Sequence, residues 1–557
     1  MIYDEKEILR LIQQGESLVL EFKSDLKSLP DRELIAAIVS LANTEGGNLL
    51  LGVEDDGSIT GLHLNHNNLN GLPAMIANKT NPSISVSVEL LKVQGHNIAC
   101  ISVPKSRQLV STSEGLLQRR RIKLDGTPEA VPFYPHEFIQ RQSSMGLIDP
   151  SAIPMLDIAV EELDPLQRLR IRNAIKKYGG DQSLLPLADD ELDGAMGLVV
   201  TVDGHKRPTL AGLLLLGSES LLRRHLPAYE VAFQVLRGTD VLVNEFFRKP
   251  LLETFEEVEL LFRARVSEEE IQVGLFRVPI PDFDRRAFRE AFVNALAHRD
   301  YGRLGAVHVK MDTDGLTISN PGGFVEGVTL ENLLVVSPRA RNPLLADIIK
   351  RIGLAERTGR GIDRIYEGML RYGRPAPDYG MSDSSTVTLQ MSSAEANLDF
   401  LKMILQCEDR AGGFMPIDSL IILSRLSEER RLTTSDLLVS VQKPEASVRA
   451  SLEKLVEAGL VEPHGAGRGR IYMLSAKVYR QSGQKAAYVR QAGFNLIRQE
   501  QMVLTYIESH GHIKRSDVIE LCSLTPSQAY HLLKKLKDQK KIIQTGEKRH
   551  AFYTKNT

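Results

Sequence analysis

The chain has 557 residues, of which 42% are hydrophobic and 25% charged, and its formal net charge is −2. This length predicts about three to five domains, and the composition is that of a globular protein. No apolar run is long enough to span a bilayer, and charged residues follow Met1 too closely for a signal peptide. The three cysteines lie far apart, which favours a reducing, cytoplasmic compartment without disulfides.

The first sixty residues carry an ordered series of patterns. Apolar and other residues alternate from Leu18 to Phe22, which predicts a half-buried strand, and residues 33–42 are apolar enough to form a buried helix. The segment Asn43 to Gly47 stops that helix, and Gly46-Gly47 permits a positive φ there. Residues 48–53 then predict a second strand, closed by the acidic turn Asp55-Asp56-Gly57. The order places several carboxylates near the ends of neighbouring strands.

This order resembles the Schlafen/AlbA-type nucleic-acid-binding domain over residues 4–140, including the arginine-rich strand at 118–123 and Pro132-Phe133. The resemblance implies an α+β domain over residues 1–142. It also implies a nucleic-acid partner, with DNA expected and RNA as the alternative. The cations expected to contact nucleic acid in this domain are Arg119, Arg120, Arg121 and Lys123.

The same resemblance implies a metal-dependent nuclease site in which Glu16, Glu21 and Asp55 are both metal ligands and catalytic residues. Carboxylates suit Mg²⁺, or alternatively Mn²⁺, which can activate water against a phosphodiester. Other interpretations stay open: Glu21 can pair with Lys23 or Arg32, an Asp-Asp-Gly run is ordinary turn chemistry, and such a domain can bind without cutting. We expect the fold to survive alanine at the carboxylates, because solvated side chains at strand ends contribute little to a core.

The middle of the chain divides into a connecting part and a second chemical centre. Residues 143–285 are predicted to form a linker and a mixed α/β connecting domain, with its clearest strands at Thr209–Gly217 and Tyr229–Leu236. Residues 286–392 are predicted to form one unit, and the connecting domain ends where it begins. The remaining residues, 397–557, have the patterns of helices with two short hairpins.

The second centre begins with a helix predicted from Arg286 to Tyr301, in which apolar residues recur at helical spacing. Glu290, Asn294 and His298 are four apart and therefore share one face of this helix. Two strands follow, the second leading into Asn320-Pro-Gly-Gly, and after a lid-like stretch Gly359-Arg-Gly361 opens another helix. Backbone amides at such a helix start favour phosphate.

This set resembles the GHKL (Bergerat) ATP-binding fold, and most closely the RecG-like C-terminal ATPase, over about residues 280–385. By that resemblance ATP and Mg²⁺ are the cofactors, Glu290 is the general base, and Asn294 ligates the Mg²⁺. Asn320 and Gly322, with the adjacent Gly323, would read the adenine, and Gly359 and Gly361 would hold the phosphates. The family's adenine-binding acid is Asn320 here, whose amide oxygen accepts a hydrogen bond without charge assistance. The chain has no P-loop, which argues against a P-loop helicase motor.

The C-terminal part, residues 397–480 and 496–557, resembles two winged helix-turn-helix modules, in which the second helix enters the major groove. Seven basic and two acidic residues lie between His531 and Arg549, so a basic patch exists despite the net charge. The cations expected to contact DNA are Arg449, Arg468 and Arg470 in the first module and Lys534, Lys535 and Lys537 in the second. Modules of this type also serve as protein-interaction or dimer units.

The sequence thus predicts an α/β multidomain protein with a Schlafen/AlbA-like domain, a central GHKL sandwich and C-terminal winged helices. The function predicted is that of a cytoplasmic, ATP-binding regulator or defence-associated protein, in which nucleotide state controls the flanking nucleic-acid-binding domains. The alternatives are a metal-dependent endonuclease under ATP control and a nucleotide-independent assembly scaffold. GHKL relatives commonly dimerise, so by analogy we expect a homo-oligomer.

Overall fold

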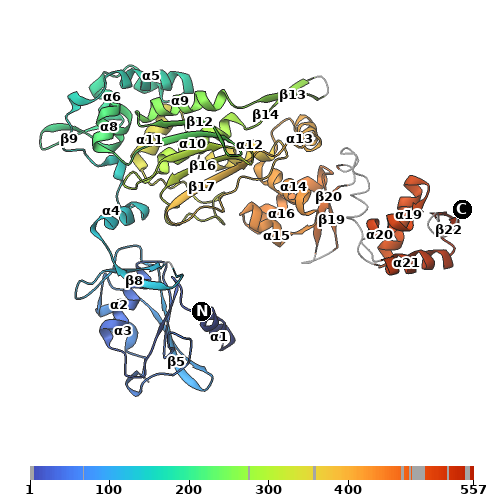
Figure 1. Ribbon diagram of the computed structural model, residues 1–557, viewed down its shortest axis with the longest axis horizontal. Helices are drawn as coiled ribbons and strands as arrows, with labels where there is room; N and C mark the ends of the chain where they lie inside the picture. The colour runs from blue at the N-terminus through green and yellow to red at the C-terminus, as the bar shows by residue number, and fades with distance from the viewer. Residues whose placement is uncertain are drawn as a thin grey trace. The chain divides into compact units, whose positions relative to one another are not determined.

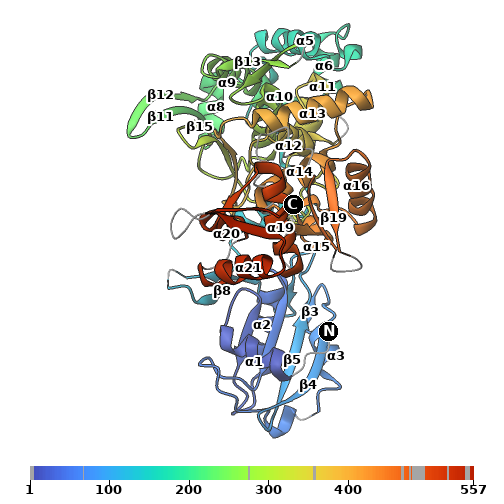
Figure 2. The same ribbon diagram turned by 90° about the vertical axis from the view of Figure 1, so that its right-hand side faces the viewer.

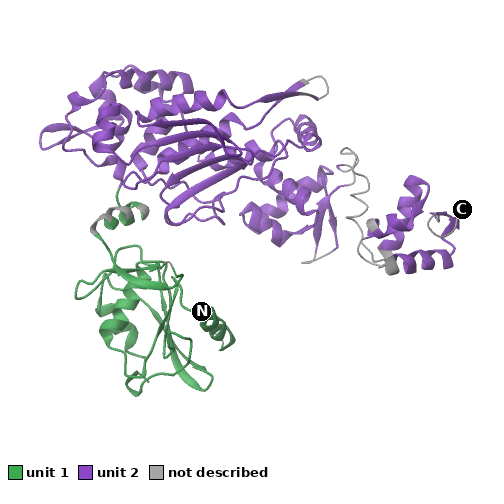
Figure 3. Cartoon of the chain, viewed as in Figure 1, with its two compact units in different colours: residues 1–148 green, residues 149–557 purple. Residues whose placement is uncertain are grey.

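The computed structural model describes residues 5–66, 68–123, 125–273, 276–355, 359–465, 470–475, 478, 496–522, 526–545 and 552–556. The chain is a mixed α/β protein that divides into two compact units, residues 1–148 and residues 149–557 (Figure 3). The division falls inside the stretch that the sequence predicted as a linker. Among the helices of the described ranges, none combines the length and hydrophobicity that crossing a lipid bilayer requires.

The first unit is built on a mixed sheet of order β1-β2-β5-β4, in which β1 and β2 are parallel and the other neighbours antiparallel. Its strands are β1 (Leu20–Lys23), β2 (Gly47–Leu51), β5 (His96–Val103) and β4 (Ser87–Val93). Helix α2 (Asp31–Ala42) is buried along most of its length, as its apolar sequence predicted. The glycine pair after it has φ values of 70° and 128°, and a Cβ on Gly47 would lie 2.0 Å from the Val19 carbonyl oxygen. Only glycine fits this close approach of β2 to the chain before β1.

Smaller elements complete this unit. They are the helices α1 (Glu5–Gln14), η1 (Leu64–His66), α3 (Leu72–Asn78) and α4 (Pro135–Ser144), and the paired strands β3 (Thr80–Asn81) with β6 (Ser111–Thr112) and β7 (Gln118–Ile122) with β8 (Pro128–Pro132). Strand β7 is the arginine-rich strand of the sequence, and α2 packs beside it.

The second unit is organised around a five-stranded sheet of order β12-β11-β15-β16-β17 (Figure 1). Its strands are β12 (Asp240–Phe247), β11 (Val231–Arg237), β15 (Val307–Met311), β16 (Gly315–Pro321) and β17 (Thr386–Ser392). Strands β11 and β15 are parallel, and the other neighbours are antiparallel. The β11–β12 hairpin forms one edge of the sheet and projects from it (Figure 2).

Several helices contribute buried side chains to the core of this sheet. They are α5 (Leu166–Tyr178), α7 (Leu210–Leu216), α9 (Leu251–Arg263), α10 (Arg285–His298), α11 (Pro343–Ile352) and α12 (Gly361–Leu370). Further elements of this region are η2 (Pro150–Ala152), η3 (Val160–Glu162), η4 (Gln182–Leu184), α6 (Asp189–Ala195), α8 (Glu219–His225), the pair β9 (Val199–Val202) and β10 (His205–Pro208), and the hairpin β13 (Glu268–Val273) and β14 (Phe276–Pro281).

The division expected at residues 285/286 does not separate two cores. One cluster of buried side chains runs from Ile158 to Met391, and the five-stranded sheet takes β11 and β12 from before that position. The parallel pairing of β11 with β15 is a long-range contact, and the local sequence carries no pattern that reports it. Residues 143–285 and 286–392 therefore share one core.

The strand predicted at Thr209–Gly217 is wrong, because these residues form helix α7. Every residue of α7 is buried, and a continuous apolar run has no periodicity that distinguishes a buried strand from a buried helix. Thr209 decides the outcome locally: its Oγ1 accepts a hydrogen bond from Gly212 N at 3.0 Å and caps the helix. The strand predicted at Tyr229–Leu236 is confirmed as β11.

The C-terminal region contains two helix-and-hairpin units with separate cores. The first C-terminal unit, residues 398–475, consists of α13 (Leu398–Ala411), α14 (Ile417–Glu429), α15 (Thr434–Val441), α16 (Glu445–Glu457) and the sheet of β18 (Leu432–Thr433), β20 (Ile471–Leu474) and β19 (Val461–His464). The second C-terminal unit, residues 496–556, consists of α19 (Leu496–His510), α20 (Arg515–Cys522), α21 (Pro526–Asp538) and the sheet of β21 (Ile513–Lys514), β23 (Phe552–Lys555) and β22 (Ile542–Thr545).

We predict that Thr209→Val destabilises the second unit by about 1–2 kcal/mol, because valine keeps the shape and removes the hydrogen bonds of the hydroxyl with Gly212 N and with the Gly197 and Leu198 carbonyls. Thr209 Oγ1 caps α7 and also donates to the Gly197 carbonyl at 2.9 Å. Denaturant unfolding followed by circular dichroism measures the change. Thr209→Ser, which retains the hydroxyl, is the control, and equal stability of the two variants would contradict the capping role.

Candidate functional site

A pocket of about 590 Å³ opens beside the central sheet of the second unit. Its walls come from α10, β16, β17, α11, the start of α12 and a loop of residues 324–341, which we call the pocket loop. The pocket loop is the lid-like stretch of the sequence. Apolar side chains form most of the wall between a few polar groups, as is usual for small-molecule sites.

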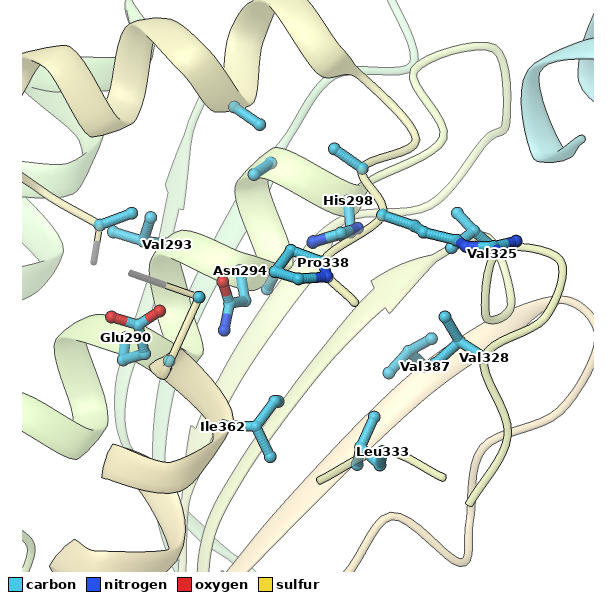
Figure 4. A pocket seen from close by; sticks show the side chains of 18 of the residues that line it. Glu290, Val293, Asn294, His298, Val325, Val328, Leu333, Pro338, Ile362 and Val387 are labelled. Carbon is cyan, nitrogen blue, oxygen red and sulfur yellow. The ribbon is translucent and has the colours of Figure 1, made fainter. Parts of the chain in front are cut away.

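Helix α10 presents Glu290, Asn294 and His298 to the pocket along one face (Figure 4). Asp284 starts the helix, since its carboxylate accepts hydrogen bonds from Arg286 N at 2.9 Å and Ala287 N at 2.8 Å. The opposite face carries the apolar stripe into the core. The spacing of four predicted this shared face, and the structure places it on the pocket.

The start of α12 lies directly against the carboxylate of Glu290. A Cβ built on Gly361 would lie 2.0 Å from Glu290 Oε1, so a larger residue there would displace the carboxylate from this position. Glu290 is 4% exposed and therefore held in a desolvated position beside the first turn of the helix. Gly359 also lines the pocket; its φ of 78° is in the left-handed region, and a Cβ there would lie 2.7 Å from Pro338 of the pocket loop.

The Asn320-Pro-Gly-Gly segment contributes unevenly to the pocket. Asn320, at the end of β16, and Gly323 line it, whereas Gly322 is not among the lining residues. Gly322 has a φ of 98°, and a Cβ there would lie 2.9 Å from the Cβ of Asp300. Gly322 thus allows the turn to pack against Asp300 outside the pocket wall.

Several pocket residues were not assigned a role from the sequence. His298 is half-buried, and its pKa is lowered to about 4, first because burial disfavours the charged ring and then because Arg341 and Lys350 repel it. The imidazole is therefore neutral at neutral pH. Lys350 on α11 and Asp363 on α12 also line the pocket. The only sequence indication for Asp363 is its position in the helical turn opened by Gly361.

The carboxylates predicted as a metal site in the first unit have other partners. Glu21 pairs with Lys23 at 2.5 Å and with the guanidinium of Arg120, and Glu16 accepts a hydrogen bond from Phe22 N at 2.8 Å. Asp55 lies in an exposed turn. Across the residues that the structure describes, no group of three or more His, Cys, Asp or Glu side chains is arranged to hold a metal ion. The Lys23 pairing left open by the sequence is present, while Arg32 pairs with Glu114 instead.

The arginines of β7 are committed to ion pairs within the first unit. Arg119 pairs with Glu137 and Arg121 with Glu129, and both pairs are at least partly exposed. Arg120 is 4% exposed, contacts Glu21 and donates to the Leu20 carbonyl at 3.3 Å. Arg120 is thus a buried structural residue rather than a surface cation, and it is the one buried residue of β7. Lys123, just after β7, is exposed.

The C-terminal cations are mostly on the surface. Arg449 is exposed and forms a helical pair with Glu445, Arg470 is exposed, and Arg468 lies outside the described residues. On α21, Lys534 and Lys537 are exposed, and Lys537 donates to the Gln544 side chain at 3.1 Å. Lys535 instead pairs with Glu500 of α19 at 2.7 Å, so part of its charge holds the unit together.

Three family models match parts of this chain. The Schlafen, AlbA_2 model matches residues 16–127, the model described as "Putative ATP-dependent DNA helicase recG C-terminal" matches residues 305–391, and a domain of unknown function (DUF8451) matches residues 139–232. The first two matches support an AlbA-type protein with an ATPase-like domain, and together they suggest an ATP-linked nucleic-acid-binding function. The ATPase-like match begins after α10, so Glu290 and Asn294 are placed by the pocket and not by the family model.

The comparison with solved structures finds the DIP2311 protein from Corynebacterium diphtheriae, known from a crystal structure. It is 20% identical, the alignment covers 98% of both chains, and the TM-score is 0.50. At this identity the similarity indicates a shared fold alone. Among curated proteins, none matches the chain.

The expectation that alanine at Glu21 leaves the fold intact is changed by the structure. We predict that Glu21→Ala destabilises the first unit by about 3 kcal/mol, because it removes the carboxylate paired with the buried guanidinium of Arg120 and leaves only the weaker interaction with Glu16. Glu129→Ala, which breaks the exposed pair with Arg121, should cost about 1 kcal/mol or less. Thermal unfolding of the two variants measures the contrast, and a small effect at Glu21 would show that the pair is not structural.

Proposed function

We propose that the central region is a GHKL-type nucleotide-binding domain and that nucleotide in its pocket controls nucleic-acid binding by the flanking parts of the chain. The observation that carries this proposal is the pocket itself. Residues that the sequence assigned to ATP from separate motifs, Glu290, Asn294, Asn320, Gly359 and Gly361, all line one cavity. A volume of about 590 Å³ suits a small-molecule ligand of nucleotide size.

The donor set of the pocket fits Mg²⁺ carried by a nucleotide. Asn294 offers an amide oxygen, which is a hard ligand. With so few protein ligands, phosphate oxygens and water would complete the shell, as Mg²⁺ prefers. When bound, the ion would supply charge neutralisation at the phosphates.

Different residues of the pocket would then contact the attacking water, the phosphates and the base. Glu290, buried beside Gly361, would accept a proton from water, and the amides at the start of α12 would face the phosphates, since a helix N-terminus favours anions. Asn320, 4% exposed at the end of β16, would accept a hydrogen bond from the base. Apolar residues of the pocket loop, such as Val325, Val328 and Leu333, would exclude water from the adenine ring of the nucleotide.

The C-terminal units support the nucleic-acid part of the proposal. Each places a helix before a β-hairpin, α16 before β19–β20 and α21 before β22–β23, as winged helices do. We propose that α21, with exposed Lys534 and Lys537, contacts phosphate or the major groove. A homo-oligomeric regulator or defence-associated protein is the biological role we propose.

The central site is tested by paired variants. Glu290→Ala should retain Mg·ATP binding and lose hydrolysis by about 10²–10⁴-fold, since only the base is removed. Asn294→Ala should raise the Kd of Mg·ATP by at least about tenfold, and EDTA should do the same to the wild type. Calorimetry measures the Kd of Mg·ATP, and phosphate release measures hydrolysis. The control is Glu395→Ala, at an exposed site outside the pocket. A wild type that binds no nucleotide at millimolar Mg·ATP would contradict the proposal.

The DNA-binding role of α21 is tested by removing charge without disturbing the core. Replacing Lys534 and Lys537 by glutamine should weaken duplex binding and lower the slope of log K against log salt by about one for each phosphate that the protein no longer neutralises. Lys535 is retained because it pairs with Glu500. The control is Lys555→Gln on β23, whose amine pairs with Glu508. An unchanged slope together with loss of the oligomer would make this unit an assembly module.

A further inference from the structure

The pocket loop is divided between two hydrophobic cores. Leu333 is 8% exposed and belongs to the core of the central sheet, whereas its neighbour Leu334 packs against the core of the first C-terminal unit. Both side chains also line the pocket. The turn that contains Leu333 and Leu334 therefore packs against both cores, and its position depends on the central sheet and on the first C-terminal unit.

Gln442 of the first C-terminal unit holds this turn by its side-chain amide. Its Oε1 accepts a hydrogen bond from Leu334 N at 2.9 Å, and its Nε2 donates to the Leu330 carbonyl at 2.7 Å. Gln442 is the C-cap of α15 and has a φ of 58°, in the left-handed region where glycine is usual. The left-handed backbone conformation is unfavourable for glutamine. Its side chain nevertheless pairs with one backbone donor and one backbone acceptor of the pocket loop, Leu334 N and the Leu330 carbonyl.

A second connection runs along α12. Asp363 in its first turn lines the pocket, Tyr366 packs against both cores, and Leu370 at its end is buried in the core of the first C-terminal unit. Lys443, next to Gln442, pairs with Asp418 of α14 at 2.7 Å. Burial raises the pKa of Asp363, and the charge of Lys443 opposes that rise, so the two groups interact. The helix that begins at the phosphate-facing end of the pocket thus ends inside the C-terminal unit.

We propose that Gln442 is a positioning residue for the nucleotide pocket, and that through it the first C-terminal unit and bound nucleotide control one another. This inference rests on the proposed function of the pocket. A nucleotide that orders the pocket loop also orders the turn to which Gln442 hydrogen-bonds. It thereby restrains α15 and α16 of the first C-terminal unit. Because coupling between sites is reciprocal, displacement of α15 changes nucleotide affinity by the same factor.

Matched variants of the full-length chain test this. Gln442→Asn keeps an amide and suits a left-handed C-cap, but it is one methylene shorter and cannot reach both Leu330 and Leu334. The control is Arg430→Asn, which places the same residue at the left-handed C-cap of α14 in the same unit. The measurements are the Kd of Mg·ATP by calorimetry and the hydrogen exchange of residues 432–464 with and without Mg·ATP. Circular dichroism melting confirms that both variants are folded.

In the wild type and in Arg430→Asn, Mg·ATP should slow exchange in α15 and α16 by about fivefold or more. In Gln442→Asn this change should disappear, and the Kd of Mg·ATP should rise about fivefold, the size expected when hydrogen bonds are removed. Equal protection of α15 and α16 in Gln442→Asn and wild type would overturn the inference. Nucleotide binding to the wild type without any protection of α15 and α16 would also overturn it and leave the proposed function standing. A wild type that binds no Mg·ATP would remove both.

Discussion

The approach of α12 to the Glu290 carboxylate is the constraint on which the pocket depends. Glu290 is buried on the pocket-lining face of α10, and it meets α12 at Gly361, where a larger side chain would displace the carboxylate. The contact brings the predicted base next to the amides of a helix start, in a desolvated setting where electrostatic interactions are strong. It also fixes the direction of α12, which ends in the core of the first C-terminal unit.

Hydrophobic packing and hydrogen bonds join the pocket to that unit. Leu333 and Leu334 pack into different cores, and the side-chain amide of Gln442 hydrogen-bonds to Leu334 N and to the Leu330 carbonyl. Protein interiors are close-packed and transmit strain. A displacement of the pocket loop is therefore passed on to the helices that pack against it.

The first unit shows how acidic and basic motifs can neutralise each other inside a domain. The glutamate at the core of the predicted metal site and the central arginine of the predicted nucleic-acid strand form one ion pair, Glu21 with Arg120. A buried guanidinium costs free energy unless it is paired, so these residues are tied to the fold whatever else the domain binds. Lys123 and the partly exposed Arg119 and Arg121 remain as cations at the surface.

Local patterns in the sequence determined the elements that present the sites. Helical spacing placed Glu290, Asn294 and His298 on one face of α10, the apolar run at 33–42 predicted the buried helix α2, and the apolar segment Tyr229–Leu236 predicted β11. Family motifs likewise indicated the ATPase-like and AlbA-type regions that the comparisons support.

The tertiary structure decided what these elements contact. It made the apolar run at Thr209–Gly217 a helix, placed β11 and β12 in the sheet of the ATPase-like region, and turned Gly322 away from the pocket wall. It also buried Arg120 against Glu21 and brought Gln442 to the pocket loop. Spacing in a sequence reports the period of one element, whereas pairs such as Gln442 and Leu334 are far apart in the chain and meet only when separate cores pack together.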